Sequence, residues 1–141
     1  MGSLIFLINI NAMIFSLAVY TAPYSSQASY SAYQFALSVL NQGHKVHRVF
    51  FYQDGVQNAT NLAAPPQDEF DLQHAWQNLA KEHNLDLVVC IAAALRRGIL
   101  DSTESKRYDK PAHNLAHEFS LSGLGQLVEA ATISDRLVSF G

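Results

Sequence analysis

Apolar positions along the chain follow two different patterns. Continuous runs of β-branched and aromatic residues predict buried strands at residues 13–20, 46–52, 85–91 and 136–140. Apolar residues spaced three and four apart predict amphipathic helices at residues 29–42 and 68–82, and a third helix that begins near Ser122. Strands that alternate with helices indicate right-handed crossover connections. The pattern therefore predicts an α/β fold: a single domain with a mostly parallel sheet and helices on both faces.

Residues at the helix ends carry capping signals. Ser29 and Asp68 are the expected N-caps of the first two helices. Gly43 and Asn84 are expected to end them, because both residue types tolerate the left-handed conformation. The third helix is expected to turn its apolar side toward the sheet, with Leu124, Leu127, Val128 and Ala131 inward.

Two polar stretches are predicted to be irregular. Residues 53–67 read as a long loop with a turn at Asp54 and Gly55. Loops of that length are uncommon in compact domains and tend to form functional sites or interfaces. Residues 101–110 are expected to be exposed.

Composition narrows the class of protein. The 141 residues fit one domain, and 49% apolar with 15% charged residues excludes a disordered chain. The low charged fraction also suggests that some apolar surface is buried against other subunits. A net charge of −3 argues against a nucleic-acid-binding surface, which would be basic. One cysteine forms no disulfide framework, which fits a reducing compartment.

The N-terminal stretch is apolar, so a signal peptide or membrane anchor has to be considered. The first Lys or Arg is Lys45, whereas a signal peptide opens with positive charge. The apolar stretch is interrupted by polar residues and is short for a spanning helix, which needs about 20 residues. We therefore expect residues 1–12 to be a dispensable extension and residues 13–141 to be the domain.

Cys90 is the main candidate for chemistry. It ends the predicted strand 85–91, and active sites in parallel α/β sheets lie at the carboxyl ends of the strands. Helix-initial amides and the cations Arg96 and Arg97 would favour the thiolate, which is the reactive form of cysteine. The loop at Pro23 and the turn at Asp54 fall on the same edge. The alternative is that Cys90 is a small core residue, since free cysteine is often buried.

Other candidate sites are weaker. Residues 122–125 (SGLG) begin a helix and could hold an anion on free amides, but glycines that allow tight packing are the simpler interpretation. His113 and His117 lie four apart without the Glu of a metalloprotease motif, so a solvated pair is expected. Arg96 and Arg97 could also be a solvated pair at a helix end. No metal site is predicted.

Five segments in this order and spacing resemble the DsrE-like sulfurtransferases. They are SAYQFA at 31–36, VFFYQDGV at 49–56, DEFDL at 68–72, CIAAALRRG at 90–98 and LSGLG at 121–125. The resemblance covers nearly all of residues 13–140, leaves residues 1–12 outside, and is closest to the bacterial sulfur relay for tRNA 2-thiouridine. It places the family's sulfur-carrying cysteine on Cys90, with Ala92, Ala93, Arg96 and Arg97 as the surroundings of the persulfide.

The resemblance implies a cytoplasmic sulfur carrier with a set of partners and no cofactor. A TusA-like protein would donate sulfane sulfur to Cys90, and a TusE-like protein would accept it. TusB-like and TusC-like subunits would join the chain in a heterohexamer, a dimer of trimers, and a later enzyme would contact the tRNA. No metal or organic cofactor, direct nucleic-acid contact or membrane contact is implied.

Three alternatives stay open at this point. The chain could be a DsrE-type subunit of a sulfur-oxidation pathway, or a noncatalytic scaffold of the same complex. It could also be a cysteine hydrolase, which requires a histidine within hydrogen-bond reach of Cys90.

Overall fold

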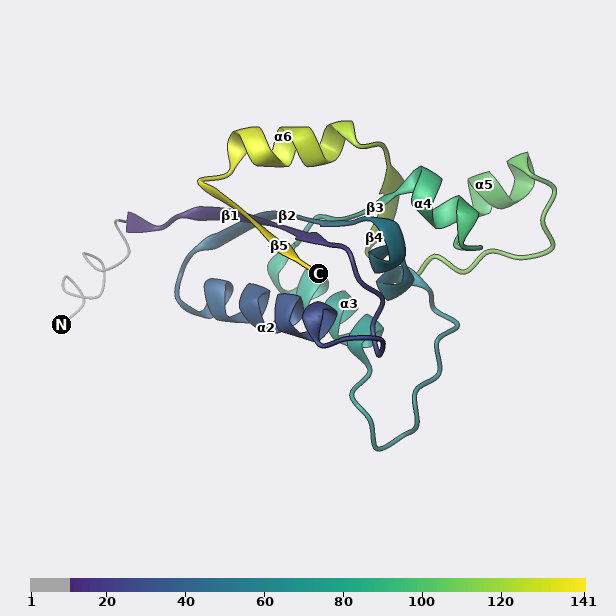
Figure 1. The fold of residues 1–141 in the computed structure, drawn as a ribbon, viewed down its shortest axis with the longest axis horizontal. Coiled ribbons are helices and arrows are strands. Elements are labelled where there is room, and N and C mark those ends of the chain that lie inside the picture. Colours follow the sequence, from purple (N-terminus) through teal and green to yellow (C-terminus); the bar gives the residue numbers. More distant parts are fainter. Residues whose placement is uncertain (1–10) are drawn as a thin grey trace.

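A five-stranded parallel sheet forms the centre of the molecule, in a computed structural model that describes residues 11–141 (Figure 1). The strand order is β4-β3-β2-β1-β5, and every neighbouring pair is parallel. The strands are β1 (Ile14–Val19), β2 (Lys45–Phe51), β3 (Leu87–Cys90), β4 (Phe119–Ser122) and β5 (Arg136–Phe140). The predicted α/β class and parallel sheet are confirmed. Residues 1–10, which hold most of the expected extension, lie outside the described residues, so the boundary at residue 13 stays a prediction.

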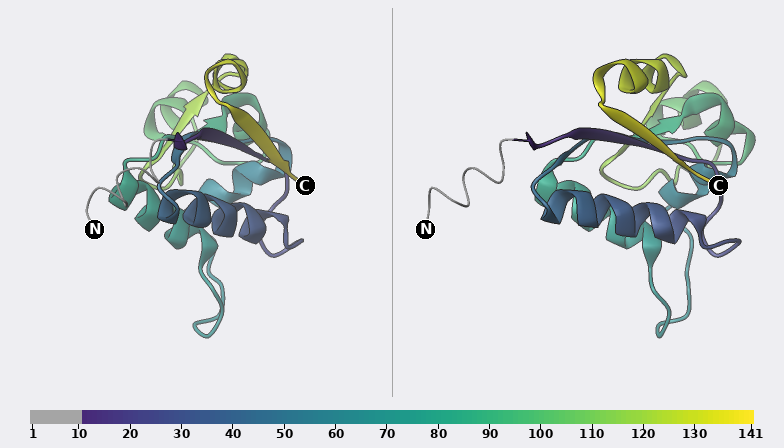
Figure 2. Two further views of the ribbon diagram at one scale, coloured as in Figure 1. Left: turned by 90° about the vertical axis from the view of Figure 1, so that its left-hand side faces the viewer. Right: turned by 60° about the vertical axis from the view of Figure 1, so that its left-hand side comes forward.

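Helices cover the two faces of the sheet unequally. Helices α2 (Ala28–Asn41) and α3 (Leu72–His83) lie together on one face, and α6 (Gly125–Ile133) lies on the other (Figure 2). The chain places β1 to β4 in succession and then returns across the sheet through α6, so that β5 pairs with β1. Three short elements accompany the carboxyl ends of the strands: the 3-10 helix η2 (Gln53–Ala59), α4 (Ile91–Arg96) and α5 (Ser102–Arg107).

The main core lies between the sheet and the helices α2 and α3. Trp76 of α3 is completely buried and its ring meets Phe51 of β2 at 5.4 Å in an edge-to-face arrangement. Tyr33 of α2 meets the same indole from another side at 5.5 Å. Edge-to-face packing adds to the gain from burying aromatic area, so these rings hold both helices on the sheet.

The helix boundaries differ from the sequence prediction at their starts. Asp71, not Asp68, caps α3, because its carboxylate accepts from the His74 amide at 3.2 Å. Helix α2 begins after Gln27, and the hydroxyl of Ser29 is turned inward to donate to the Thr21 carbonyl. Both predicted helix ends are confirmed, with Gly43 at φ 85° and Asn84 at φ 54°. The sequence predicted α2 and α3 correctly but could not distinguish the neighbouring polar residues that compete for the cap.

Three further elements were missed in the sequence. Strand β4 has only four residues in which polar and apolar side chains alternate, so its pattern is too short to stand out. Half of the predicted loop at 53–67 is the 3-10 helix η2, which buries polar as well as apolar residues. The stretch 101–110 contains α5, in which Glu104 and Ser105 are buried instead of exposed.

Helix α6 does not pack as its apolar pattern predicts. Ala130 is its only buried residue, whereas Val128 is 66% exposed and Leu124, the residue before the helix, is 46% exposed. Ala131 is also exposed and Leu127 is half-buried, so the expected inward set is largely wrong. The sheet supplies the reason, because the face under α6 presents the polar side chains of Ser16 and Arg48.

Polar contacts attach α6 to the sheet instead. The buried guanidinium of Arg48 donates to the Gln126 carbonyl at 2.9 Å and lies 3.3 Å from the Glu129 carboxylate. His47 contacts the same carboxylate at 2.7 Å. The hydrogen bond from His47, aided by the charge of Arg48, holds the pKa of Glu129 below its ordinary value of 4.5.

Gly55 is fixed by close packing at the end of β1. A Cβ at this position would lie 2.0 Å from the Val19 carbonyl oxygen, which no side chain can accommodate without backbone movement. Gly123 is a matched contrast, because a Cβ there would meet nothing within 4 Å.

Gly55→Ala is expected to lower the free energy of unfolding by about 2–3 kcal/mol, because the added methyl group displaces η2 from the strand end. Gly123→Ala is expected to stay within about 0.5 kcal/mol. Urea unfolding followed by circular dichroism measures both. Equal effects of the two substitutions would contradict the close approach at Gly55.

Glu129→Gln is expected to make the melting temperature depend less on pH between pH 3 and pH 7. Since the folded-state pKa of Glu129 is lowered, its contribution is complete above the unfolded value of about 4.5 and is lost as the pH falls through the folded value. Thermal melts from pH 3 to pH 7 should therefore show a variant that is less stable at pH 7 and approaches the parent chain at pH 3. Asp109→Asn, at an exposed position outside this cluster, is the control. A difference that grows toward low pH would contradict the assignment.

Candidate functional site

Cys90 lies where the sequence predicts, at the carboxyl end of β3. It is the last residue of the strand and the N-cap of α4, with φ −60° and ψ 117°. Its side chain is 3% exposed and free of any disulfide. The thiol therefore sits at the edge where parallel α/β sheets bind ligands, shielded from solvent in the single chain.

The strand beside Cys90 brings a residue that the sequence analysis did not connect with it. Cys90 pairs in register with Ser122 at the end of β4, so a hydroxyl-bearing residue lies one strand spacing away, about 4.8 Å in such sheets. Helix α6 begins three residues later at Gly125. The signal was present in the LSGLG segment, but it could be linked to Cys90 only by recognising β4 as a strand.

The glycines of that segment do not serve close packing. A Cβ at Gly123 or at Gly125 would meet nothing within 4 Å, so the interpretation as tight-packing glycines is wrong. They lie instead in the turn from β4 into α6, so two helices, α4 and α6, start beside the end of β3 and β4.

Arg97 has a defined partner and is not a free solvated charge. Its Nε donates to the Asp54 carboxylate at 2.8 Å, and its Nη1 donates to the Ala93 carbonyl at 3.1 Å. Asp54 belongs to η2, so this ion pair joins α4 to the loop that follows β2. The predicted proximity of the Asp54 turn to Cys90 is thereby confirmed, through the helix that Cys90 starts.

Arg96 points to a different environment from Arg97. It is exposed and lines a hollow of about 560 Å³ together with Lys110, Tyr108 and apolar residues from the segment between α4 and β4. Ala92 and Ala93 occupy the first turn of α4, Ala92 exposed and Ala93 buried. The structure thus brings Ala92 and Ala93 next to Cys90 and directs Arg96 and Arg97 to separate contacts.

A polar network positions η2 at this edge. The buried Asn58 amide donates to the Gly55 carbonyl at 2.9 Å and to the Ser29 hydroxyl at 3.1 Å, and it accepts from the Trp76 indole at 3.3 Å. The Ser29 hydroxyl in turn donates to the Thr21 carbonyl at 2.6 Å. The loops after β1 and β2 are therefore held together by buried hydrogen bonds, which restrict their movement.

The cysteine-hydrolase alternative requires a histidine that hydrogen-bonds to Cys90. Within residues 11–141, Cys90 forms no hydrogen bond to a histidine. His44 instead accepts from the Met13 amide, and His47 contacts Glu129. In the same part of the chain, no three His, Cys, Asp or Glu side chains are grouped so as to hold a metal ion. No helix in that range combines the length and apolar character needed to cross a membrane.

Comparison with known proteins supports the sequence-based resemblance. Residues 13–140 match the model of the DsrE/DsrF-like family. The chain is 54% identical over 129 residues to a putative sulfurtransferase DsrE of Allochromatium vinosum, covering 92% of this chain and 99% of the relative. It is 51% identical over 128 residues to sulfurtransferase TusD of Klebsiella pneumoniae, covering 91% of this chain and all of the relative. Sulfurtransferase TusD of Serratia proteamaculans is 54% identical over 86% of this chain and 95% of the relative.

A solved structure agrees with the fold. The crystal structure of the ychN protein from E. coli aligns with a TM-score of 0.71 over 92% of this chain and 99% of the other, at 17% identity. That identity supports the architecture alone. The family match and the three sulfurtransferase relatives carry the activity: the chain belongs to the DsrE/DsrF-like family and is a sulfurtransferase of the sulfur-relay type.

Proposed function

We propose that Cys90 carries sulfane sulfur as a persulfide, taking it from a TusA-like donor and passing it to a TusE-like acceptor for 2-thiolation of the tRNA wobble uridine in the cytoplasm. The observation that carries the proposal is the position of the chain's single thiol. Cys90 ends a parallel strand at the ligand-binding edge of the sheet and starts a helix whose first amides lack intrahelical partners.

The chemistry is a pair of sulfur exchanges. The Cys90 thiolate attacks the terminal sulfur of the donor's persulfide, a new S–S bond forms on Cys90, and the donor leaves as a thiolate. The acceptor thiolate then attacks the terminal sulfur on Cys90, and the Cys90 thiolate is released. Each step forms one S–S bond and breaks one, so no external oxidant or reductant is consumed.

The burial of Cys90 suits a carrier. A persulfide at this position, where Cys90 is 3% exposed in the single chain, is less accessible to small thiols than a persulfide on the surface and is therefore reduced more slowly. The second sulfur extends the side chain by about 2 Å, the length of an S–S bond. In the single chain the Cys90 side chain makes no capping hydrogen bond to α4. The amides of the first turn of α4, which includes Ala92 and Ala93, lack intrahelical partners and are the donors proposed for the thiolate or the persulfide anion.

The two arginines have different roles in the proposal. Arg97 holds α4 against η2 through Asp54, so it positions the residue that starts α4. Arg96 is exposed beside Lys110 and presents positive charge to the donor protein. Electrostatic attraction of this kind acts mainly on the rate of encounter and weakens with salt.

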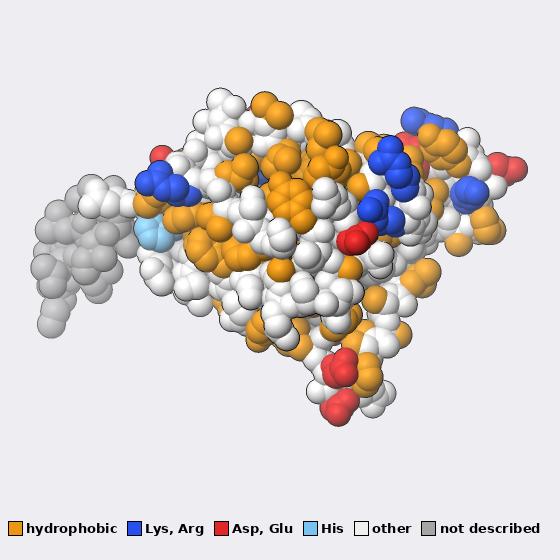
Figure 3. Space-filling view, in the orientation of Figure 1, with side chains coloured by type: hydrophobic (Ala, Val, Ile, Leu, Met, Phe, Trp, Pro, Cys, Tyr) orange, Lys and Arg blue, Asp and Glu red, His pale blue; other side chains and the backbone are white. Residues whose placement is uncertain are grey.

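In the proposed heterohexamer, TusB-like and TusC-like subunits would cover the solvent-exposed apolar face of α6. Exposed apolar side chains gather there and on β5 (Figure 3), including Leu124, Val128, Ile133 and Leu137. Helix α6 buries little against its own sheet, so contact with another subunit would remove this surface from water. This agrees with the low charged fraction of the sequence.

A sulfur-oxidation subunit is the second candidate. The 54% identity to a putative sulfurtransferase DsrE equals or exceeds that to the TusD relatives, so similarity alone does not separate the two pathways. Both use the same exchange on Cys90. A noncatalytic scaffold is the third candidate, and it predicts no sulfur on Cys90 at all.

Cys90→Ser is expected to keep the fold and abolish sulfur transfer, because the serine hydroxyl cannot form the S–S bond. Intact-mass spectrometry after incubation with a persulfidated donor, with partner subunits present, should show a gain of one sulfur atom in the parent chain. Reductant should reverse it, and the variant should show none. A parent chain that gains no mass would favour the scaffold.

The parent chain and the Cys90→Ser variant also distinguish tRNA thiolation from sulfur oxidation in cells. In a host that lacks its own TusD homologue, the parent chain should restore 2-thiouridine in hydrolysed tRNA, measured by nucleoside mass spectrometry, and Cys90→Ser should not. Sulfur loading in vitro without restoration in the host would favour the sulfur-oxidation role.

A further inference from the structure

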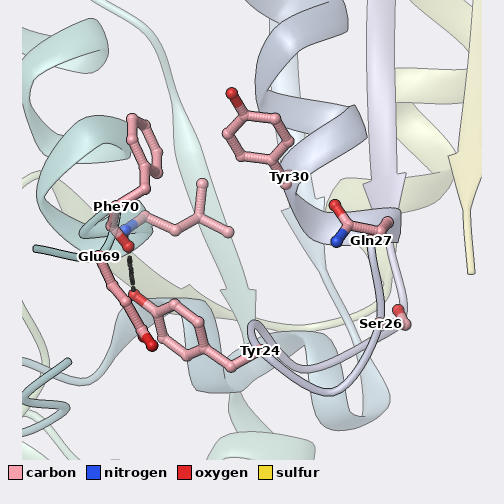
Figure 4. A pocket seen from close by; sticks show the side chains of 7 residues that line it. Tyr24, Ser26, Gln27, Tyr30, Glu69 and Phe70 are labelled. Atoms are coloured by element: carbon pink, nitrogen blue, oxygen red, sulfur yellow. Dashed lines mark hydrogen bonds between the residues drawn. The ribbon is translucent and has the colours of Figure 1, made fainter. Parts of the chain in front are cut away.

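A second pocket lies apart from Cys90, between the loop after β1 and the segment that leads into α3. It has a volume of about 290 Å³ and three aromatic rings in its wall, Tyr24, Tyr30 and Phe70. Figure 4 shows Phe70 and Glu69 on one side, Tyr30 and Gln27 on the other, and Tyr24 below. The proposed sulfur transfer does not use these residues.

The pocket is already formed in the single chain. Tyr24 has the left-handed backbone conformation, φ 70°, which is uncommon for a residue with a side chain. Its hydroxyl donates to the Phe70 carbonyl at 3.0 Å (Figure 4). The same hydroxyl accepts from the Leu72 amide at 3.2 Å. One tyrosine hydroxyl thus joins the two walls of the pocket. The left-handed backbone of Tyr24 is a local strain of the kind that is typical of functional sites.

The aromatic rings are presented to solvent although they pack on each other. Tyr24 is 55% exposed, Phe70 46% and Tyr30 39%. Phe70 meets Tyr30 edge to face at 5.2 Å and Tyr33 at 5.7 Å. Burial, with the neighbouring Tyr30 and Glu82, raises the pKa of Tyr33 above its ordinary value. The rings therefore form a fixed pocket wall that is partly open to solvent.

The charged side chains around the pocket are negative. Glu69 is in its wall, and Asp68 and Asp71 flank the same segment. No Lys or Arg occurs in the two segments that contribute the pocket walls, residues 11–44 and 49–80. Among the described residues Glu69 takes part in no ion pair. Aromatic faces combined with an unpaired carboxylate attract cations.

We propose that this pocket binds the side chain of an arginine or lysine presented by a partner protein. Its volume fits one long side chain, and drug-sized ligands occupy larger cavities. A free amino acid would bring its own carboxylate next to Glu69 and Asp68, so a side chain within a polypeptide is favoured. The interaction goes beyond sulfur transfer and needs no chemistry on Cys90.

The test uses capped arginine, N-acetyl-arginine methylamide, and its neutral isostere, N-acetyl-citrulline methylamide. Titration into the ¹⁵N-labelled full chain should shift amide signals of residues 24–30 and 69–72 with the arginine probe. The citrulline probe should bind several-fold more weakly, since it lacks the charge that the rings and Glu69 attract. Equal binding of the two probes, or shifts confined to other residues, would overturn the proposal.

Variants assign the effect to named residues. Glu69→Gln and Phe70→Leu should each weaken arginine binding about threefold, with circular dichroism confirming the fold. Asp109→Asn removes an exposed carboxylate outside the pocket and should leave binding unchanged. Equal weakening by Glu69→Gln and Asp109→Asn would indicate a general charge effect and would overturn the assignment to this pocket.

Free arginine distinguishes a protein-borne side chain from a small molecule. Capping removes both the α-ammonium and the α-carboxylate, so the capped probe and free arginine have the same net charge of +1. The capped probe should bind more tightly, because only free arginine brings a carboxylate next to Glu69 and Asp68. Tighter binding of free arginine would overturn the part of the proposal that concerns a partner protein.

Discussion

The buried side-chain amide of Asn58 connects the elements on which the functional edge depends. Asn58 belongs to η2 and bonds to Gly55 within that helix, and it joins η2 to α2 through Ser29 and to α3 through Trp76. A buried amide that lost these partners would retain the cost of desolvation, so the network favours one arrangement of the loops. From η2 the order extends through Asp54 and Arg97 to α4, the helix that Cys90 starts. The position of the thiol is therefore linked to a polar cluster in the core.

The two faces of the sheet are built by different physical means. Aromatic packing around Trp76 and Phe51 holds α2 and α3. On the other face a buried arginine, Arg48, bonds to the backbone and carboxylate of α6, while the apolar side chains of that helix face outward. Leaving one partner of a buried charge unpaired is costly, so these contacts keep α6 in place without an apolar seam. The arrangement leaves an apolar surface for other subunits in the proposed assembly.

Two regions of the carboxyl edge carry opposite charge. The hollow beside α4 has Arg96 and Lys110 in its wall, and the aromatic pocket between the β1 loop and α3 has Glu69. Opposite charges on separate surfaces allow different partners to be attracted to different places on one small domain. The proposed relay needs at least a donor and an acceptor, and such a separation would help them to be distinguished.

The sequence by itself determined the strands β1, β2, β3 and β5, the longer helices α2, α3 and α6, the parallel sheet and the place of Cys90 at a strand end. These follow from the periodicity of apolar residues, which depends on neighbours along the chain. Tertiary structure alone decided that Ser122 pairs beside Cys90, that Arg97 meets Asp54 and that Tyr24 joins Phe70. Tyr24 and Phe70 are 46 positions apart in the chain and Arg97 and Asp54 are 43 apart, so no local sequence pattern encodes contacts of this kind. The outward face of α6 belongs to the same group, because the polar side chains that prevent its burial come from β1 and β2.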